Sequence, residues 1–205
     1  YSYSRFCELY QKWHRRQRIT MRQVHRAGEK MFVDYAGVTP FWTNRKTGQE
    51  VKGQLFVAVL GASNFTYVEV TATQKVPDFV QSHINAFEYF GGVPEVIVPD
   101  QLKSGVPRAC RYEPGIQRSY AEMAEHYGTV VIPARPRKPK DKAKAEAGVL
   151  VAERWILARL RHSTFFSRHE VAARVAELRE ELNNRVMRGY GKSRRELYEG
   201  WDRPV

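Results

Sequence analysis

The first half of the chain alternates short apolar runs with turn-forming residues. Residues 30–37 (KMFVDYAG) predict a strand that closes at Gly37, because Met, Phe, Val and Tyr favour a pleated, packed setting. A hairpin with its turn near residues 44–48 follows, and GQLFVAVLGAS and FTYVEVTAT predict two further strands joined by residues 62–64. The pattern therefore predicts an antiparallel group of strands at the start of a folded core.

Helical spacing then alternates with short strands. A helix that begins at Pro77 carries a core-facing set at helical spacing, namely Phe79, Val80, Ile84, Phe87 and Tyr89 (or Phe90). The elements after it are, in order, a strand in PEVIVPD that ends at Asp100, a helix over 117–127, a strand in TVVIP, a long helix from about Asp141 to Arg161, and a last helix over about 168–183. Three antiparallel strands followed by helix, strand, helix, strand and long helix are the order of the ribonuclease H-like α/β fold, a mixed sheet flanked by helices.

Two segments flank this predicted core. Residues 5–26 predict a basic helix with one apolar stripe made of Phe6, Leu9, Tyr10 and Trp13. We therefore divide the chain into a linker helix (1–28), a core (29–162) and a C-terminal helical extension (163–205) that ends in a loose basic tail. The opening YSYSRFCELYQKW has no Met and no signal segment, so an excised fragment is expected.

The net charge of +12 lies in two blocks. Residues 1–30 carry eight Lys and Arg against two acidic residues, and residues 134–162 carry nine against three. The core between them is slightly acidic. This distribution is typical of a protein that binds a polyanion, although solvated helix faces are the alternative.

Composition excludes several classes of protein. Hydrophobic residues make up 42% of the chain, which is ordinary for a folded domain, and no run reaches the roughly 18–20 apolar residues that span a bilayer. The 2 cysteines and 6 scattered histidines give neither a disulfide framework nor a zinc pattern, which suits a reducing cytosol. We therefore expect a cytoplasmic protein with no membrane partner.

Acidic residues at three places suggest chemistry. Asp34 stands in the middle of a predicted strand, where a carboxylate is costly unless it is paired or binds a cation. Asp100 ends a short apolar strand, where side chains of open α/β sheets reach a cleft. The long helix offers three further candidates: Asp141 is better placed as its N-cap, Glu146 lies between two alanines, and Glu153 is roughly 10 Å further along. We favour Glu146.

These carboxylates predict a magnesium site. Three converging carboxylates repel one another unless a cation neutralises them. Mg²⁺ prefers oxygen ligands, and two ions about 3.5–4 Å apart can activate the attacking oxygen and stabilise the leaving one. We therefore expect two Mg²⁺ ions on Asp34, Asp100 and Glu146, with Mn²⁺ able to substitute. The alternative is three structural residues: a surface strand residue, a turn residue and a helix salt-bridge partner of Lys142.

Basic side chains lie close to these acids in the sequence. Phosphate contacts of this kind fix the position of DNA and carry little sequence information. The candidates for DNA binding are Lys103, Arg135, Arg137, Lys138, Lys140, Lys142 and Lys144.

Four segments carry a resemblance to a known family. GEKMFVDYAG, VPDQLKSGV, AEHYG and ARPRKPKDKAKAEAGVLVAERWILARLR resemble the IstA-type transposases of the insertion-sequence-21 family, within the DDE transposase and retroviral-integrase superfamily. The resemblance covers nearly the whole chain. In one departure, the family usually has Asn after the second aspartate, and this chain has Gln101.

The resemblance implies a fold, a site and a reaction. It implies an integrase catalytic core in which Asp34, Asp100 and Glu146 form the metal-binding triad. It also implies cleavage of DNA at transposon ends, joining of the 3′-OH to target DNA, assembly into a homo-oligomer on DNA, and an AAA+ ATPase partner. A bacterial, nucleoid-associated location follows. Two other functions remain open: a nuclease of the same fold that only hydrolyses, and a catalytically silent DNA-binding module.

Overall fold

A five-stranded mixed sheet forms the centre of the molecule. The structure is a computed structural model that describes residues 2–16, 24–99, 118–134 and 139–203. The strand order is β5-β4-β1-β6-β7. The strands are β1 (Lys30–Tyr35), β4 (Gln54–Leu60), β5 (Thr66–Thr71), β6 (Val96–Pro99) and β7 (Val130–Val131).

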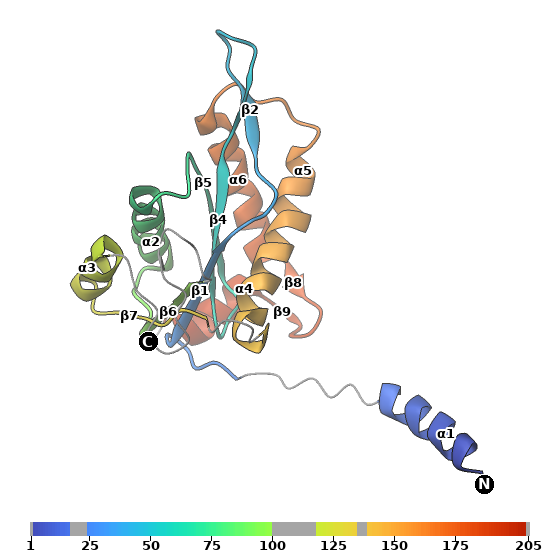
Figure 1. Cartoon of the computed structure of the whole chain (residues 1–205). Helices are drawn as coiled ribbons and strands as arrows, with labels where there is room; N and C mark the ends of the chain where they lie inside the picture. The colour runs from blue at the N-terminus through green and yellow to red at the C-terminus, as the bar shows by residue number, and fades with distance from the viewer. Residues whose placement is uncertain (1, 17–23, 100–117, 135–138, 204–205) are drawn as a thin grey trace.

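The pairing of these strands confirms the predicted fold. β1 is antiparallel to β4, and β4 is antiparallel to β5. On the other side, β1 is parallel to β6, and β6 is parallel to β7. The short strands β2 (Phe41–Thr43) and β3 (Glu50–Lys52) form the predicted hairpin, whose turn contains Gly48 at a φ of +69°. Figure 1 shows this hairpin extending beyond one end of the sheet.

Helices α2 (Val76–Phe90) and α3 (Arg118–His126) cover one face of the sheet (Figure 1). α2 starts with a proline in its first turn, which is favourable because the missing N–H has no helical partner there. Its buried side chains include Phe79, Phe87 and Phe90, as the spacing predicted. They join Met31, Val33 and Tyr35 of β1 in one core cluster.

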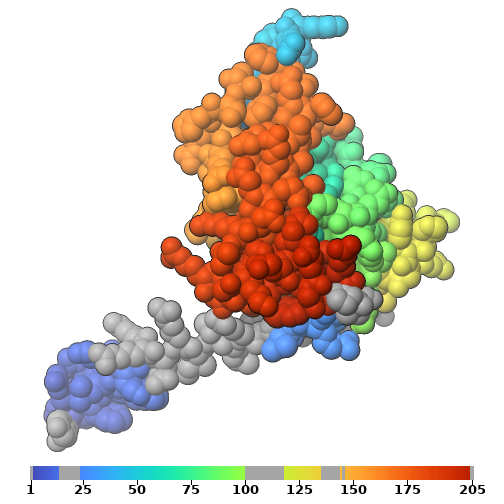
Figure 2. Space-filling view, turned by 180° about the vertical axis from the view of Figure 1, so that it is seen from behind, coloured from blue at the N-terminus to red at the C-terminus, as the bar shows by residue number. Residues whose placement is uncertain are grey.

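A long helix and α6 (Arg168–Asn184) cover the opposite face. The long helix runs through α4 (Pro139–Ala152), a π-helical segment η1 (Glu153–Leu157) and α5 (Ala158–Leu160). α6 has Ser167 as its N-cap, and the Ser167 hydroxyl accepts a hydrogen bond from the Glu170 backbone N–H. Buried side chains of β4, η1 and α6 form the second core cluster, and Figure 2 shows residues of α6 and the C-terminal elements covering much of this side.

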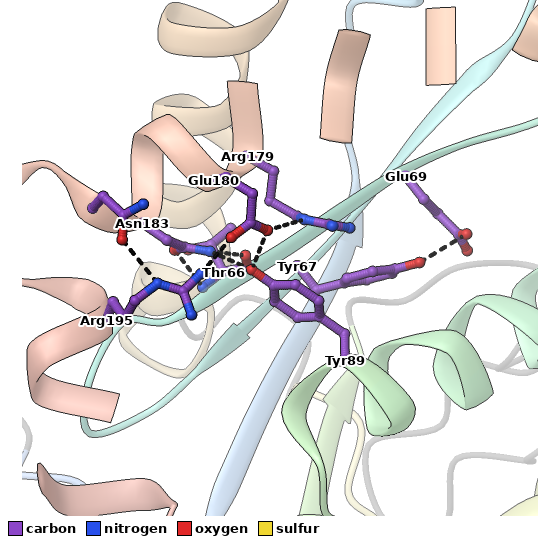
Figure 3. A network of polar contacts seen from close by, with 9 residues as sticks. Thr66, Tyr67, Glu69, Tyr89, Arg179, Glu180, Asn183 and Arg195 are labelled. Atoms are coloured by element: carbon purple, nitrogen blue, oxygen red, sulfur yellow. Dashed lines mark hydrogen bonds and ion pairs between the residues drawn. The ribbon is translucent and has the colours of Figure 1, made fainter. Parts of the chain in front are cut away.

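Polar contacts fix α6 to the sheet and to α2 (Figure 3). Asn183 accepts a hydrogen bond from the Thr66 backbone N–H at 3.1 Å and donates one to the Thr66 carbonyl at 2.8 Å. Tyr89 donates its hydroxyl proton to Glu180 at 2.8 Å, and the Arg179 guanidinium lies 4.1 Å from the centre of the Tyr89 ring. These contacts join α6 to β5 and α2. The division of the chain into a linker helix, a core and an extension, with boundaries at residues 28 and 162, stays a prediction.

The C-terminal residues are folded, so the expectation of a loose basic tail is wrong. They form β8 (Val186–Met187), β9 (Lys192–Ser193), α7 (Arg194–Leu197) and η2 (Tyr198–Asp202). Ser193 and Glu196 form a capping box at the start of α7. The Asp202 carboxylate accepts backbone N–H groups from Gly28 at 3.0 Å and Ser63 at 3.1 Å, which ties the end of the described chain to the base of the sheet.

The N-terminal helix α1 (Tyr3–Arg16) is shorter than the predicted helix over 5–26. Residues 24–26 are not helical, because residues 26–29 make a turn in which Glu29 accepts the Arg26 backbone N–H and Gly28 has a φ of +67°. Residues 17–23 lie outside the described part. Figure 1 shows α1 standing apart from the sheet, and its stripe is exposed: Phe6 59%, Leu9 43%, Tyr10 50% and Trp13 54%.

The start of α4 also differs from the prediction. α4 begins at Pro139, so Asp141 lies inside its first turn and is not its N-cap. Proline is well suited to a helix start because its φ is preset and its absent N–H leaves no unpaired donor. None of the helices in the described residues is long and apolar enough to cross a membrane.

Candidate active site

Asp34 lies on the face of the sheet that carries the long helix. Met31, Val33 and Tyr35 of β1 point into the core beneath α2. Side chains alternate along a strand, so Asp34 points to the opposite face. Its register partner on β4 is Val57, which belongs to the core cluster shared with η1 and α6.

The Asp34 carboxylate is half-buried at this position. Its Oδ1 accepts the backbone N–H of Tyr35 at 2.8 Å. A hydrogen bond to a carboxylate from a fixed backbone group orients the carboxylate as well as stabilising its charge. The strand therefore holds this acid in one orientation beside the long helix.

The strand β6 ends beside Asp34. Pro99 of β6 is the parallel register partner of Val33, the residue before Asp34. Asp100 follows Pro99 in the sequence and lies outside the described residues, as does Gln101. The described part of β6 thus reaches the level of the first predicted ligand.

Glu146 is exposed on α4, and α4 packs closely on the sheet two residues later. A Cβ atom on Gly148 would stand 2.4 Å from Cγ2 of Val59 on β4, a distance that real side chains do not adopt. Gly148 is therefore a point of very close approach between α4 and β4. Ala147, which flanks Glu146, is exposed and does not take part in this packing.

Glu153, the alternative to Glu146, is engaged by backbone groups. Its Oε1 accepts the N–H of Gly37 at 3.0 Å and the N–H of Val38 at 3.3 Å. Two hydrogen bonds at one oxygen compete with metal binding at that oxygen. This contact favours Glu146 as the third ligand and was not evident in the sequence, because residues 37 and 153 are 116 positions apart.

The predicted DNA-binding residues fall into three groups. Lys103, Arg135, Arg137 and Lys138 lie outside the described residues. Lys140 and Lys142 belong to the first turns of α4, on the approach to Glu146. Lys144 is half-buried, and it is two residues from Glu146 and so about 200° away around the helix.

The charge of Lys144 is influenced by residues at the base of the sheet. Burial lowers the pKa of Lys144 below its ordinary value, with Asp202 opposing and Arg194 adding to this shift. Burial also lowers the pKa of His25, and the positive charge of Lys144 contributes to that shift. Lys144 therefore lies in the electrostatic environment of Asp202 and His25 at the base of the sheet.

The ligand chemistry fits a hard cation. Within the described residues, no three His, Cys, Asp or Glu side chains gather closely enough to hold a metal ion. Two of the three predicted ligands, Asp34 and Glu146, are described, and both are carboxylates at least partly open to solvent. An all-carboxylate donor set is the kind that Mg²⁺ prefers.

Comparison with known proteins identifies the family. Residues 24–139 match the integrase core domain family, and the chain belongs to this family. Over all 205 residues it is 47% identical to "Putative transposase y4uI" of Sinorhizobium fredii and to "Putative transposase for insertion sequence IS408" of Burkholderia multivorans. It spans only 40% of the length of each of these relatives.

A more distant relative matches the predicted resemblance directly. Over 120 residues the chain is 27% identical to "Transposase for insertion sequence element IS21" of Pseudomonas aeruginosa, covering 58% of this chain and 31% of that protein. The predicted resemblance to insertion-sequence transposases of the DDE class is therefore confirmed.

Solved structures show the same fold. The chain is similar to the HTLV-2 integrase catalytic core domain in complex with magnesium, with a TM-score of 0.61, 14% identity, and coverage of 86% of this chain and 99% of that one. It is also similar to a chain of the simian T-cell lymphotropic virus intasome, with a TM-score of 0.64, 12% identity, and coverage of 86% and 57%. At these identities the likeness shows the fold alone.

Proposed function

We propose that this chain is the catalytic core of a DDE transposase that cleaves transposon-end DNA and joins the 3′-OH ends to target DNA. The observation that carries this proposal is the position of Asp34. Its carboxylate is held on β1, on the sheet face that carries α4, beside the end of β6. The similarity to insertion-sequence transposases supplies the reaction class.

Asp34, Asp100 and Glu146 would hold two Mg²⁺ ions, with Mn²⁺ able to substitute. When bound, the ions supply activation of the attacking oxygen and stabilisation of the leaving oxygen. The fold relative from HTLV-2 was solved in complex with magnesium, which supports this choice of ion. The protein's own contribution is to orient the carboxylates, Asp34 through the Tyr35 N–H and Glu146 through the close packing of α4 at Gly148.

DNA would lie along the basic side chains before and within α4. Lys140 and Lys142 occupy the start of the helix that carries Glu146, so phosphates bound there would approach the carboxylates. Lys103, Arg135, Arg137 and Lys138 complete the proposed set. Lys144 is its weakest member, because its half-buried ammonium lies in the environment of Asp202 and His25.

The proposed assembly is a homo-oligomer on paired DNA ends. A fold relative was solved within an intasome and another in a trimeric form, which supports assembly. The resemblance alone implies an AAA+ ATPase partner, and a bacterial cytoplasmic, nucleoid-associated location belongs to the same proposal.

Strand transfer by the longer parent protein tests the proposal. The substrate is a pre-cut transposon end with a free 3′-OH, mixed with a target duplex, with and without Mg²⁺. We expect joined products that require Mg²⁺ or Mn²⁺. Hydrolysis without joining would support a nuclease of the same fold, and the absence of both reactions would support a silent DNA-binding module.

A further inference from the structure

The Glu153 side chain connects the helix that carries Glu146 to the strand that carries Asp34. Glu153 is half-buried at the first position of η1, directly after α4. Its Oε1 accepts the backbone N–H groups of Gly37 and Val38, three and four residues beyond Asp34. A single oxygen thus joins the two elements that supply the predicted ligands.

The helix geometry makes this connection relevant to Glu146. Glu153 and Glu146 are seven residues apart, which places them on the same helix face at heights that differ by about 10 Å. A shift of Glu153 along or around the helix axis would move Glu146 by a similar amount, because the intervening turns are rigid. Gly148 packs directly on Val59 and is a second point at which this helix is held against the sheet, so the two contacts together set the position of Glu146.

The local helix type supports a specific role for this position. The helix changes from α to π at Glu153 and returns to α at Ala158. π-helical segments are rare and occur frequently at functional sites. Ile156 and Leu157, within this segment, are buried in the core cluster. The π segment therefore accommodates both the contact of Glu153 with the residues that follow β1 and the burial of Ile156 and Leu157.

The backbone N–H groups of Gly37 and Val38 are not part of the hydrogen-bond ladder of the sheet. Gly37 and Val38 lie beyond the last residue of β1, and both are exposed. Hydrogen bonds from backbone N–H groups to a carboxylate are stronger than those to neutral acceptors. Glu153 therefore helps to fix the segment that follows β1 to the helix.

We propose that Glu153 is a positioning residue: by accepting the Gly37 and Val38 N–H groups, it sets the position of Glu146 relative to Asp34. This inference rests on the proposed function, in which those two carboxylates hold the catalytic ions. Glu153 acts through its hydrogen bonds and does not bind the ions. Because a misplacement of about 1 Å can cost about 100-fold in rate, a contact of this kind matters even though it touches no substrate.

Substitution of Glu153 in the full-length protein tests the proposal. Glu153→Ala removes the acceptor, whereas Glu153→Gln keeps an oxygen that can accept the same N–H groups but is a poor ligand for Mg²⁺. Glu125→Ala, at an exposed glutamate of α3, is the matched control. Two quantities are measured for each variant: amide hydrogen exchange at Gly37 and Val38, and the rate of end cleavage.

The expected pattern separates positioning from ligation. Glu153→Ala should speed exchange at both amides by about tenfold, as expected for loss of a charge-assisted hydrogen bond, and should slow cleavage by about tenfold or more. Glu153→Gln should keep most of the exchange protection and stay within a fewfold of the wild-type rate. An inactive Gln variant with intact amide protection would overturn the proposal, because Glu153 would then be a ligand. A fully active Ala variant would overturn it as well.

Glu146→Gln, measured in parallel, keeps the two proposals distinguishable. If Glu146→Gln remains active, the proposed triad is wrong whatever Glu153 does. If Glu146→Gln is inactive and Glu153→Ala cleaves at the wild-type rate, only the positioning role fails.

Discussion

The stability of the fold should depend on pH through one buried histidine. His83 of α2 is fully buried, and its Nδ1 lies 2.7 Å from the carbonyl oxygen of Phe79. Its Nε2 lies 3.0 Å from the hydroxyl of Tyr120 on α3. A neutral ring satisfies both contacts, with Nδ1–H donating to the carbonyl and Nε2 accepting the Tyr120 proton.

Burial lowers the pKa of His83 to about 4, against 6.5 for an ordinary histidine, and the hydrogen bond to the Phe79 carbonyl opposes this shift only in part. As pH falls below 6.5, His83 becomes protonated in the unfolded chain, whereas in the folded chain it stays neutral until the pH is near 4. The stabilisation is therefore complete above pH 6.5 and is lost as pH falls towards 4. Linkage gives a loss of about 2 kcal/mol in the free energy of unfolding between pH 7 and pH 5, and about 3 kcal/mol in full.

Urea denaturation at pH 7 and pH 5 measures this loss. The carboxylates also titrate in this range, so the informative quantity is the pH-dependent change in the wild type minus that in His83→Gln, which removes the titrating ring. We expect this difference to be about 2 kcal/mol, whereas His169→Gln, at an exposed histidine, should behave as the wild type. An identical pH dependence in wild type and His83→Gln would refute the reasoning.

Two further predictions concern DNA binding and assembly. Neutralising Lys140, Lys142 and Lys144 together should weaken DNA binding. The slope of log affinity against log salt concentration should flatten by roughly 0.9 for each phosphate that is no longer neutralised, with most of the change due to Lys140 and Lys142. An unchanged slope in a salt titration would show that these side chains are merely solvated. We expect the exposed apolar stripe of α1 to be a binding surface. Sedimentation should then find a monomer or weak dimer without DNA and a larger assembly with transposon-end DNA. A stable monomer that joins ends efficiently would contradict this.

The fold could be predicted from local sequence patterns because its strands and helices are strongly patterned. The apolar run around Asp34 identifies a strand, and the helical spacing from Phe79 to Phe90 identifies a helix and its buried face. The order of these elements then determines the topology. The C-terminal elements were missed although Ser193 and Glu196 stand three residues apart, which is the spacing of a capping box and a recognisable helix start.

The candidate site could be predicted only in part, because its details depend on contacts between distant segments. Nothing near Glu153 in the sequence indicates that its carboxylate binds the N–H groups of Gly37 and Val38. The surroundings of Lys144 could not be predicted either. In the sequence it is one of several basic residues in a row, whereas in the structure Asp202 influences its charge and it influences that of His25. Residue type and spacing identify candidates, and tertiary packing decides the direction of each side chain.

The most direct test of the central claim is strand transfer by the full-length protein carrying Asp34→Asn, Asp100→Asn or Glu146→Gln, one at a time. Each substitution removes a charged ligand at nearly constant volume, so folding and DNA binding should be retained. Joining of a pre-cut transposon end to a target duplex in Mg²⁺ should fall below detection in all three. Wild-type joining by any one of these variants would remove that residue from the triad, and wild-type joining by Asp34→Asn would contradict the proposed catalytic core itself.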